Sequence, residues 1–364
     1  MSTKKIKVGI LFGGKSAEHE VSLQSAKNVA EAIDKDKYEV SLIGIDKSGQ
    51  WLLPKQSQYL LNASDPKRIQ LNHEERESVA LVPESGGALS DLTSGGTHSS
   101  IGVVFPILHG PFGEDGTVQG LLKLAGVPFV GAGVLGSSVG MDKDVMKRLL
   151  RDAGLPIGNF VVLRRNDLLD FKAVAEEIGL PCFIKPANLG SSVGVHKVTD
   201  QTSFEAACAD AFSFDNKILV EEFIDGRELE CAVLGNENPE ASVVGEIVPS
   251  HEFYSYDAKY IDDQGAALVI PANVPDTVSE QIRALAIQTF QTLECEGLGR
   301  VDCFLKNDGT VLVNEINTIP GFTKISMYPQ LWEASGLPYA DLINRLIELA
   351  IERFEREETL KTSV

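Results

Sequence analysis

The stretch GRVDCFLKNDGTVLVNEIN, residues 299–317, predicts a β-hairpin that brings two acidic side chains face to face. Its central Asp-Gly pair favours a tight turn, and residues numbered symmetrically about such a turn lie opposite each other on antiparallel strands. Asp302 then faces Glu315, and Arg300 faces Asn317. Because side chains alternate with a period of two, all four point to one face of the hairpin, with opposed pairs about 5 Å apart.

Two carboxylates held this close repel each other, so a positive charge is expected between them. The two acids and the amide oxygen of Asn317 are hard oxygen donors, which suit Mg²⁺ or Mn²⁺ that is also bound to phosphate. The alternative is a solvated acidic face, since Asp and Glu are mostly exposed in proteins. The register is itself a prediction, because a three-residue loop at the turn would shift every pair.

Length and composition indicate a compact, enzyme-sized protein of two or three domains. The chain has 364 residues, of which 43% are hydrophobic and 23% are charged. Its net charge of -19 argues against nucleic acid or a membrane surface as a partner, because both require a basic protein surface. No apolar run suits a secretory signal or a transmembrane span. Five scattered cysteines without metal-binding spacing favour buried thiols in a reducing cytoplasm.

The first part of the chain is predicted to alternate strands with helices, beginning with a βαβ unit. A Gly- and Ser-rich segment, 84–100, predicts a flexible surface loop or an insertion. Apolar runs and amphipathic spacing define the elements. The predicted strands are 7–12, 38–45 and 102–108, and the predicted helices are 22–33 and 117–125.

A second region begins near Asp142, which is predicted to cap a helix that runs to about Ala153. A Gly/Ser loop, 186–192, is expected at a hairpin tip, and a strand pair is expected around Asp225-Gly226. The buried stripe of a long helix precedes the acidic hairpin and ends at Gly297. The further predicted strands are 182–185, 193–198, 218–223 and 228–234, and the helix stripe spans 282–293.

Lysines and acids outside the hairpin are candidates for binding a phosphorylated ligand. Lys185 ends a strand before a small-residue loop whose backbone N–H groups suit phosphate, although the segment does not match a P-loop. Lys143, behind the helix cap, is a second candidate. An ordinary hairpin and a solvated lysine are the alternatives. Glu221, Glu222 and Glu228 lie in or beside strands and could accept hydrogen bonds from adenine or ribose, or be edge charges that deter aggregation.

The motifs together resemble a known family. Lys185 with GSSVG, the acidic segment 221–228, GRVD at 299–302 and NEINTIPGF at 314–322 closely resemble the ATP-grasp ligases. GGKSAEHEVSL at 13–23 and HGPFGEDG at 109–116 narrow the resemblance to the D-alanine–D-alanine ligase family.

The resemblance implies an α/β (α+β) fold of three domains. A Rossmann-like, pre-ATP-grasp βαβ domain, 1–131, would bind the first D-alanine. Two α+β domains, 132–221 with a phosphate flap and 222–364 with the metal and second-substrate sites, would hold ATP between them.

The resemblance also implies a reaction. ATP would phosphorylate the carboxylate of one D-alanine, and the amine of a second would displace phosphate to give D-alanyl-D-alanine for peptidoglycan precursors. D-alanine and ATP would be the small-molecule partners of a cytoplasmic homodimer that binds neither nucleic acid nor membrane.

Each candidate residue takes a role from the resemblance. Glu18 would bind the first substrate's ammonium and link to Ser191 and Tyr260, which would hold a loop at 254–262 closed against water. The phosphates would meet Lys143, Lys185 and Lys259, adenine would meet Glu221 and Glu222, and ribose would meet Glu228. Two Mg²⁺ or Mn²⁺ ions would be held by Asp302, Glu315 and Asn317. Arg300 and the N–H of Gly321 would stabilise the developing oxyanion. Ser326 and Met327 would bind the carboxylate of the second substrate.

Several alternatives stay open. His109 lies at a strand end beside the site, but a lone His is more often structural, and no residue stands out as the general base for the amine. Tyr260 favours the dipeptide over the D-alanyl-D-lactate product of related ligases. Another carboxylate–amine ligase, such as a glutathione synthetase type, is the second hypothesis. A non-catalytic dinucleotide-binding protein is the third, although the first strand is not followed by G-x-G-x-x-G.

Overall fold

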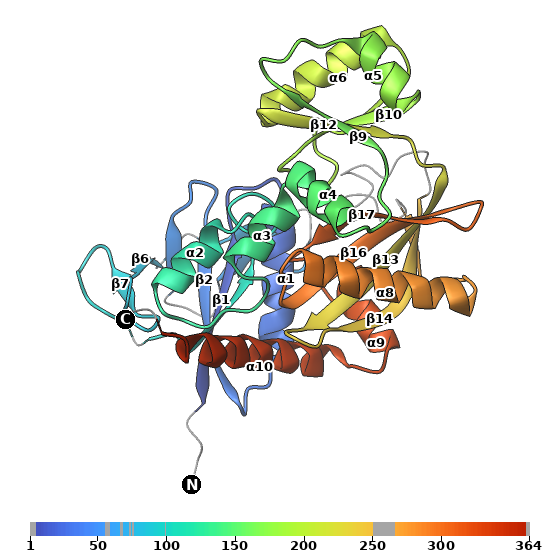
Figure 1. Cartoon of the computed structure of the whole chain (residues 1–364). Helices are drawn as coiled ribbons and strands as arrows, with labels where there is room; N and C mark the ends of the chain where they lie inside the picture. Colours follow the sequence, from blue (N-terminus) through green and yellow to red (C-terminus); the bar gives the residue numbers. More distant parts are fainter. Residues whose placement is uncertain are drawn as a thin grey trace.

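A computed structural model describes residues 5–54, 59–65, 68–72, 74, 76–98, 100–249 and 266–361. Figure 1 shows two large bodies side by side, with a smaller body, carrying α5 and α6, standing above them. Within the described part of the chain, no helix has both the length and the apolar character needed to cross a bilayer.

The N-terminal body is built on a sheet of strand order β7-β6-β3-β2-β1-β8. The predicted βαβ opening is confirmed, because β1 pairs in parallel with both β2 and β8. Gly13 has a φ of +94°, and a side chain there would meet the carbonyl of Ile45. The elements are β1 (Ile6–Gly13), α1 (His19–Ala32), β2 (Tyr38–Ile45), β3 (Trp51–Pro54), β6 (Arg76–Leu81), β7 (Leu89–Asp91), β8 (Val103–Ile107) and α2 (Thr117–Leu124), with a small pair β4 (Leu60–Leu61) and β5 (Gln70–Leu71).

The prediction of a loop throughout 84–100 is wrong, because β7 lies within it and pairs with β6. Two residues explain the strand. Leu89 is buried in the core, and Asp91 accepts the N–H of Thr93 at 2.7 Å and so closes the turn that follows.

The central body is an antiparallel sheet of order β11-β10-β12-β9, with its own hydrophobic core. The predicted hairpin around the Gly/Ser loop is confirmed, since β10 and β11 pair directly. The central body stands apart from the other two in Figure 1, joined through the chain segments that enter β9 and leave β12. Its elements are β9 (Phe160–Arg164), α5 (Phe171–Ile178), β10 (Cys182–Pro186), β11 (His196–Val198), α6 (Gln201–Phe214) and β12 (Lys217–Glu222).

The C-terminal body is a sheet of order β15-β14-β13-β16-β17. Helix α4 contributes Met146 and Leu150 to the core of this sheet and Val139 of α3 packs against it, whereas the core of the central body begins at Val161. The division of the chain at 131 and 221 stays a prediction. The elements are α3 (Val134–Met141), α4 (Lys143–Asp152), β13 (Gly226–Gly235), β14 (Glu240–Pro249), β15 (Ala266–Val269), α8 (Asp276–Thr292), β16 (Gly297–Lys306), β17 (Val311–Asn317), α9 (Met327–Ala334) and α10 (Tyr339–Glu358).

The strand pair predicted around Asp225-Gly226 is wrong. β12 belongs to the central sheet and β13 to the C-terminal sheet, so the two strands do not pair. The Asp-Gly dipeptide lies where the chain crosses from one body to the other. The predicted helix before the acidic hairpin exists as α8, but it ends at Thr292 rather than Gly297.

At the end that carries Arg300 and Asp302, the strands of the acidic hairpin pair in the predicted register, although the turn is not the predicted one. Arg300 pairs with Asn317 and Asp302 with Glu315, as expected. The turn is a three-residue loop, because the Lys306 N–H donates to the Thr310 carbonyl, and pairs near it are shifted by one residue. A bulge at 314 adds one residue and restores the register.

Helix α10 joins the N-terminal and C-terminal bodies, and Figure 1 shows it running beneath both. One hydrophobic core contains Val8 and Phe105 from the first body together with Phe322 and Leu346 from the last. The side chain of Arg353 is buried among them. It donates hydrogen bonds to the carbonyls of two residues in the connection between the bodies, and its guanidinium lies 4.5 Å from the Phe129 ring centroid.

We expect Arg353→Met to destabilise the protein by about 3 kcal/mol, because it leaves the buried carbonyls of Phe129 and Gly131 without their charged donor. The shift in the urea midpoint measures the loss. Arg345→Met on the same helix is the control, since Arg345 is 41% exposed and pairs with Glu352 at the surface, where ion pairs contribute little. Equal shifts for the two variants would show that Arg353 does not lock the bodies together.

Candidate functional site

The face of the β16–β17 hairpin carries a compact ionic network. Arg300 makes two hydrogen bonds to Asp302, at 2.7 and 2.8 Å, and the amide of Asn317 donates to the same carboxylate at 2.9 Å. Glu230, on the neighbouring strand β13, is buried and lies 2.9 Å from the Arg300 Nε atom. The predicted need for positive charge beside these acids is therefore met by the protein itself on the Asp302 side.

Lys143 supplies the positive charge on the Glu315 side. Its Nζ atom lies 3.3 Å from the Glu315 carboxylate and donates to the Leu189 carbonyl at 2.8 Å. It thereby connects the C-terminal hairpin to the loop after β10. The predicted cap of α4 is confirmed, because Asp142 accepts the N–H of Val145 at 3.1 Å.

The start of α4 is also fixed from the central body. Lys217, on β12, lies 2.6 Å from the Asp142 carboxylate and 3.0 Å from that of Asp144. The backbone N–H of Lys143 donates to the Ala187 carbonyl at 3.0 Å. Side chain and backbone together therefore determine where Lys143 stands.

A buried acid, Glu221, separates two buried lysines. Its carboxylate lies 2.7 Å from the Nζ atom of Lys185 and 3.4 Å from that of Lys147. Burial alone would raise the pKa of Glu221, but the two lysines outweigh it and the net pKa is lowered. Burial lowers the pKa of Lys147, whereas Glu221 and Glu315 raise that of Lys185 against the effect of its burial. Glu221 and the two lysines therefore hold one another in place through their opposite charges.

The N-terminal body contributes Glu18, which reaches the central body. The hydroxyl of Ser191 donates to the Glu18 carboxylate at 2.5 Å, as the motif resemblance predicted. Ser191 and Ser192 both have left-handed backbones, with φ of 55° and 59°, which is unusual for residues other than glycine. The loop is therefore bent sharply toward Glu18.

His109 and Glu114 connect the N-terminal body to the loop that follows β17. The Nδ1 atom of His109 is 2.9 Å from the carbonyl oxygen of Ile319. Because a carbonyl can only accept, Nδ1 carries the proton, and the Nε2 atom of the neutral ring is an acceptor. Nε2 is buried and has no hydrogen-bond partner among the described residues. Glu114 accepts the N–H groups of Gly110 and Ile319.

The predicted second-substrate residues lie together at the N-terminus of α9. A side chain on Gly321 would come within 3.1 Å of the Ser326 hydroxyl, so the two residues are neighbours. Ser326 is the N-cap of the helix and Met327 its first residue. First-turn N–H groups lack partners within a helix and attract anions. The position suits a carboxylate.

Other predicted residues lie elsewhere. The Glu222 carboxylate accepts the N–H of Asn159 at 2.7 Å, so it joins the end of β12 to the chain segment that enters β9. Glu228 lies on β13 opposite Phe304 of the hairpin strand. Lys259 and Tyr260, with the loop 254–262, lie outside the described residues, and their roles stay predictions.

Three charged residues of the site were missed by the sequence argument. Lys147 follows Lys143 by one helical turn, so the two share a face of α4, and this spacing was a usable signal. Glu230 is two residues beyond Glu228 on one strand and directly opposite Asp302. Glu114 stood inside the quoted motif HGPFGEDG but received no role.

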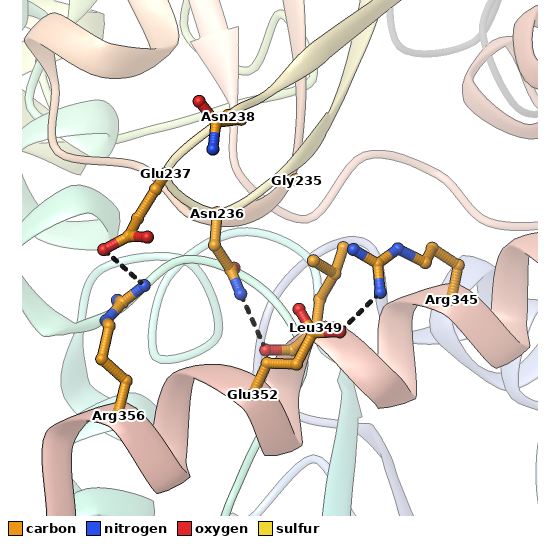
Figure 2. A pocket seen from close by; sticks show the side chains of 8 residues that line it. All are labelled: Gly235, Asn236, Glu237, Asn238, Arg345, Leu349, Glu352 and Arg356. Carbon is orange, nitrogen blue, oxygen red and sulfur yellow. Dashed lines mark hydrogen bonds and ion pairs between the residues drawn. The ribbon is translucent and has the colours of Figure 1, made fainter. Parts of the chain in front are cut away.

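A separate hollow lies between the β13–β14 turn and α10 (Figure 2). Its arginines are already paired, since Arg345 contacts Glu352 at 2.7 Å and Arg356 contacts Glu237 at 3.7 Å. The five cysteines are free and buried, which confirms the prediction of core thiols. Burial raises the pKa of Cys231 to about 12. Neither feature belongs to the charged site.

The three bodies and the charged site between them define the chain as an ATP-grasp ligase. Comparisons with known proteins make the assignment specific. The family described as D-ala D-ala ligase N-terminus matches residues 7–132, and D-ala D-ala ligase C-terminus matches residues 149–348. The chain belongs to the D-alanine–D-alanine ligase family.

Similar proteins cover the chain throughout. It is 57% identical to the D-alanine–D-alanine ligase of Shouchella clausii, over 99% of this chain and 98% of that one, and 55% identical to D-alanine–D-alanine ligase A of Escherichia coli K12, over 99% and 100%. Among solved structures, the D-alanine-D-alanine ligase of Coxiella burnetii has a TM-score of 0.86 at 38% identity, covering 98% of this chain and 97% of that one. The VanG D-Ala:D-Ser ligase of Enterococcus faecalis has a TM-score of 0.85 at 35% identity, covering 95% and 100%.

We expect Glu221→Gln to destabilise the fold by about 3–5 kcal/mol at pH 7, because two buried lysines lose their counter-charge. The pKa of Glu221 lies below its usual 4.5, so the stabilisation is complete above that pH and is lost as the pH falls through the lowered pKa. Denaturant midpoints of wild type and variant should therefore converge in acid.

The matched control is Glu222→Gln, because glutamine keeps an acceptor for the N–H of Asn159. Its midpoint should stay near that of wild type at every pH. A difference between wild type and Glu221→Gln that persists unchanged to low pH would contradict the assigned charge state.

Proposed function

We propose that this protein joins two D-alanine molecules to D-alanyl-D-alanine at the expense of ATP, for the synthesis of peptidoglycan precursors. The observation that carries the proposal is the contact between Lys143 and Glu315. It places a lysine, which can bind phosphate, against a glutamate, which can bind a metal ion, at the place where all three bodies meet. Family membership specifies the reaction as a ligation.

The ATP phosphates are bound by Lys143 and Lys185, whose ammonium groups stand on facing elements of the C-terminal and central bodies. Glu221 keeps Lys185 charged and fixed. Adenine lies against the chain that follows β12, near Glu221 and Glu222, and ribose lies near Glu228. Lys259 adds a further contact to the terminal phosphate in this proposal.

Asp302, Glu315 and Asn317 form the metal site for Mg²⁺ or Mn²⁺, and we propose two ions. Among the described residues no group of three or more acidic, His or Cys side chains is arranged to hold a metal ion by itself. Two carboxylates and an amide oxygen are therefore a donor set that phosphate oxygens complete, as expected of Mg²⁺ bound with a nucleotide. Bound metal neutralises phosphate charge during phosphoryl transfer.

The first D-alanine is bound through its ammonium group by Glu18. Its carboxylate attacks the terminal phosphate of ATP, which releases ADP and forms an acyl phosphate. Ser191 links Glu18 to the flap, and Tyr260 extends this link to the loop that excludes water from the intermediate.

The amine of the second D-alanine then attacks the acyl carbon, and phosphate leaves. Arg300 and the N–H of Gly321 stabilise the oxyanion that forms. Ser326 and the N–H of Met327 bind the carboxylate of this second substrate. His109 presents Nε2 as an acceptor, which suits a proton held on a substrate amine.

The setting of the enzyme follows from its substrates. ATP and free thiols both suit the cytoplasm, and all five cysteines are free.

We also propose a homodimer formed through the N-terminal body. Leu124 on α2, at 62% exposed, supports an interface there, and Leu135 on α3, a helix that contacts α2, is 59% exposed.

We expect Asp302→Asn and Glu315→Gln each to lower D-alanine-dependent ADP release by about 100-fold or more in the presence of Mg²⁺, because each removes a charged metal ligand. Asp308→Asn is the control, since Asp308 lies in the turn of the same hairpin and is 61% exposed. Turnover by either site variant at the wild-type rate would refute the metal assignment.

Substrate choice is tested with the wild-type enzyme. ADP release is measured with D-alanine alone and with D-alanine plus D-lactate, D-serine or L-alanine, and the product is identified by mass. We expect D-alanyl-D-alanine as the main product, because the motifs match the dipeptide enzymes. A mixed D-alanyl-D-serine or ester product at a higher rate would overturn the choice of second substrate.

A further inference from the structure

Glu114 makes a bridge between two loops that belong to different bodies. Its Oε2 atom accepts the N–H of Gly110 at 2.7 Å, within the N-terminal body. Its Oε1 atom accepts the N–H of Ile319 at 3.0 Å, within the loop after β17. Each oxygen of a single carboxylate therefore accepts one backbone donor, and the two donors are distant in the sequence.

A third hydrogen bond closes the bridge into a ring. Gly110 directly follows His109, whose Nδ1 atom donates to the carbonyl of Ile319 at 2.9 Å. Ile319 is thus held at both its N–H and its C=O by residues 109–114. Gly321, whose N–H is assigned to the oxyanion, is two residues further along the same loop.

We propose that Glu114 is a positioning residue for the ligation, which sets the distance and orientation between His109 and the Gly321 loop. This inference rests on the function proposed above, in which those two groups act on the substrates. Glu114 itself acts through the backbone of both loops. Its role is geometric, because it ties the loop that carries His109 to the loop that carries Gly321.

The surroundings of Glu114 explain why a carboxylate stands there. Two N–H donors require two acceptor oxygens, which glutamate has and glutamine lacks. Burial and the nearby charge of Glu18 raise the pKa of Glu114 to about 8, while the two N–H bonds and Lys143 act in the opposite direction. The carboxylate is costly at this place, so the bridge it makes is a specific requirement of the site.

The same charges fit the proposed substrate. A side chain on Gly110 would come within 3.1 Å of the Glu18 carboxylate, so the turn beside His109 packs directly against Glu18. Two acids lie close together at this end of the site, and a bound ammonium group of an amino acid would favour their charged forms. The bridge therefore lies at the wall of the first-substrate pocket.

The test compares Glu114→Gln with Asp115→Asn. Asp115 is a matched control, because its carboxylate also accepts two backbone N–H groups, from Phe112 and Thr117, but both lie in its own loop. We expect Glu114→Gln to lower kcat for D-alanine ligation by about 10- to 100-fold, as misplacement of reacting groups by about 1 Å does. KM for ATP should stay within about 2-fold, since the lysines are untouched.

A shorter acid separates reach from the presence of a carboxyl group. Glu114→Asp keeps the carboxyl group but is one methylene too short to contact both loops, so we expect it to lose kcat as Glu114→Gln does. If Glu114→Gln does not fold, Glu114→Asp decides the question. Wild-type kcat in Glu114→Asp, or equal losses in Glu114→Gln and Asp115→Asn, would overturn the proposal.

The imidazole of His109 gives a second readout. Nitrogen-15 NMR of the wild type, assigned with a His109→Gln variant, should show a proton on Nδ1, and this signal should weaken in Glu114→Gln. An unchanged signal alongside a lowered kcat would refute positioning through His109 and Ile319. Absence of D-alanine-dependent ADP release in the wild type would instead refute the proposed function and leave the NMR comparison as an independent test of the bridge.

Discussion

The opposition of Asp302 and Glu315 across one hairpin is the constraint on which the site depends. Two like charges at this separation need compensation, and the protein supplies it from two sides: Arg300 from the same strand and Lys143 from α4. In the proposed reaction, Lys143 would leave Glu315 for phosphate, and Asp302, Glu315 and Asn317 would hold the metal that accompanies ATP, whose positive charge would then compensate the acids.

Each of the three bodies reaches the site by a contact that crosses to another body. Glu18 bonds Ser191, His109 bonds Ile319, and Lys143 bonds the carbonyl of Leu189. The N-terminal and C-terminal bodies share one core, whereas the central body has its own. The crossing contacts described above for the central body are hydrogen bonds and ion pairs, whereas the other two bodies are joined by a continuous apolar core. The parts that must admit ATP are held by hydrogen bonds, and the parts that must stay fixed are held by apolar packing.

Much of the architecture could be predicted from the sequence, because strands such as Tyr38–Ile45 and helices such as α4 have strong periodicity and caps. The hairpin register was predicted correctly although its turn was not. The loop is one residue longer than Asp-Gly implied, and the bulge at 314 compensates for it. The register was predicted by counting residues symmetrically about the turn. Such a count cannot detect a longer loop and a bulge that shift the strand pairs in opposite directions. The same local signal failed at Asp225-Gly226, because a turn dipeptide does not reveal whether the strands beside it enter one sheet or two.

The missed residues share a physical cause. Lys147, Glu230 and Glu114 are charges whose partners come from other elements, and their sequence neighbours give no sign of burial. In water each would be an ordinary exposed residue, which is the correct expectation for its type. Burying such a group costs several kcal/mol unless a partner meets it, so an acid or lysine inside the protein implies a second group placed to receive it. The motif residues with assigned roles touch ligands, whereas buried or half-buried charges that pair with another element hold those ligand contacts in place.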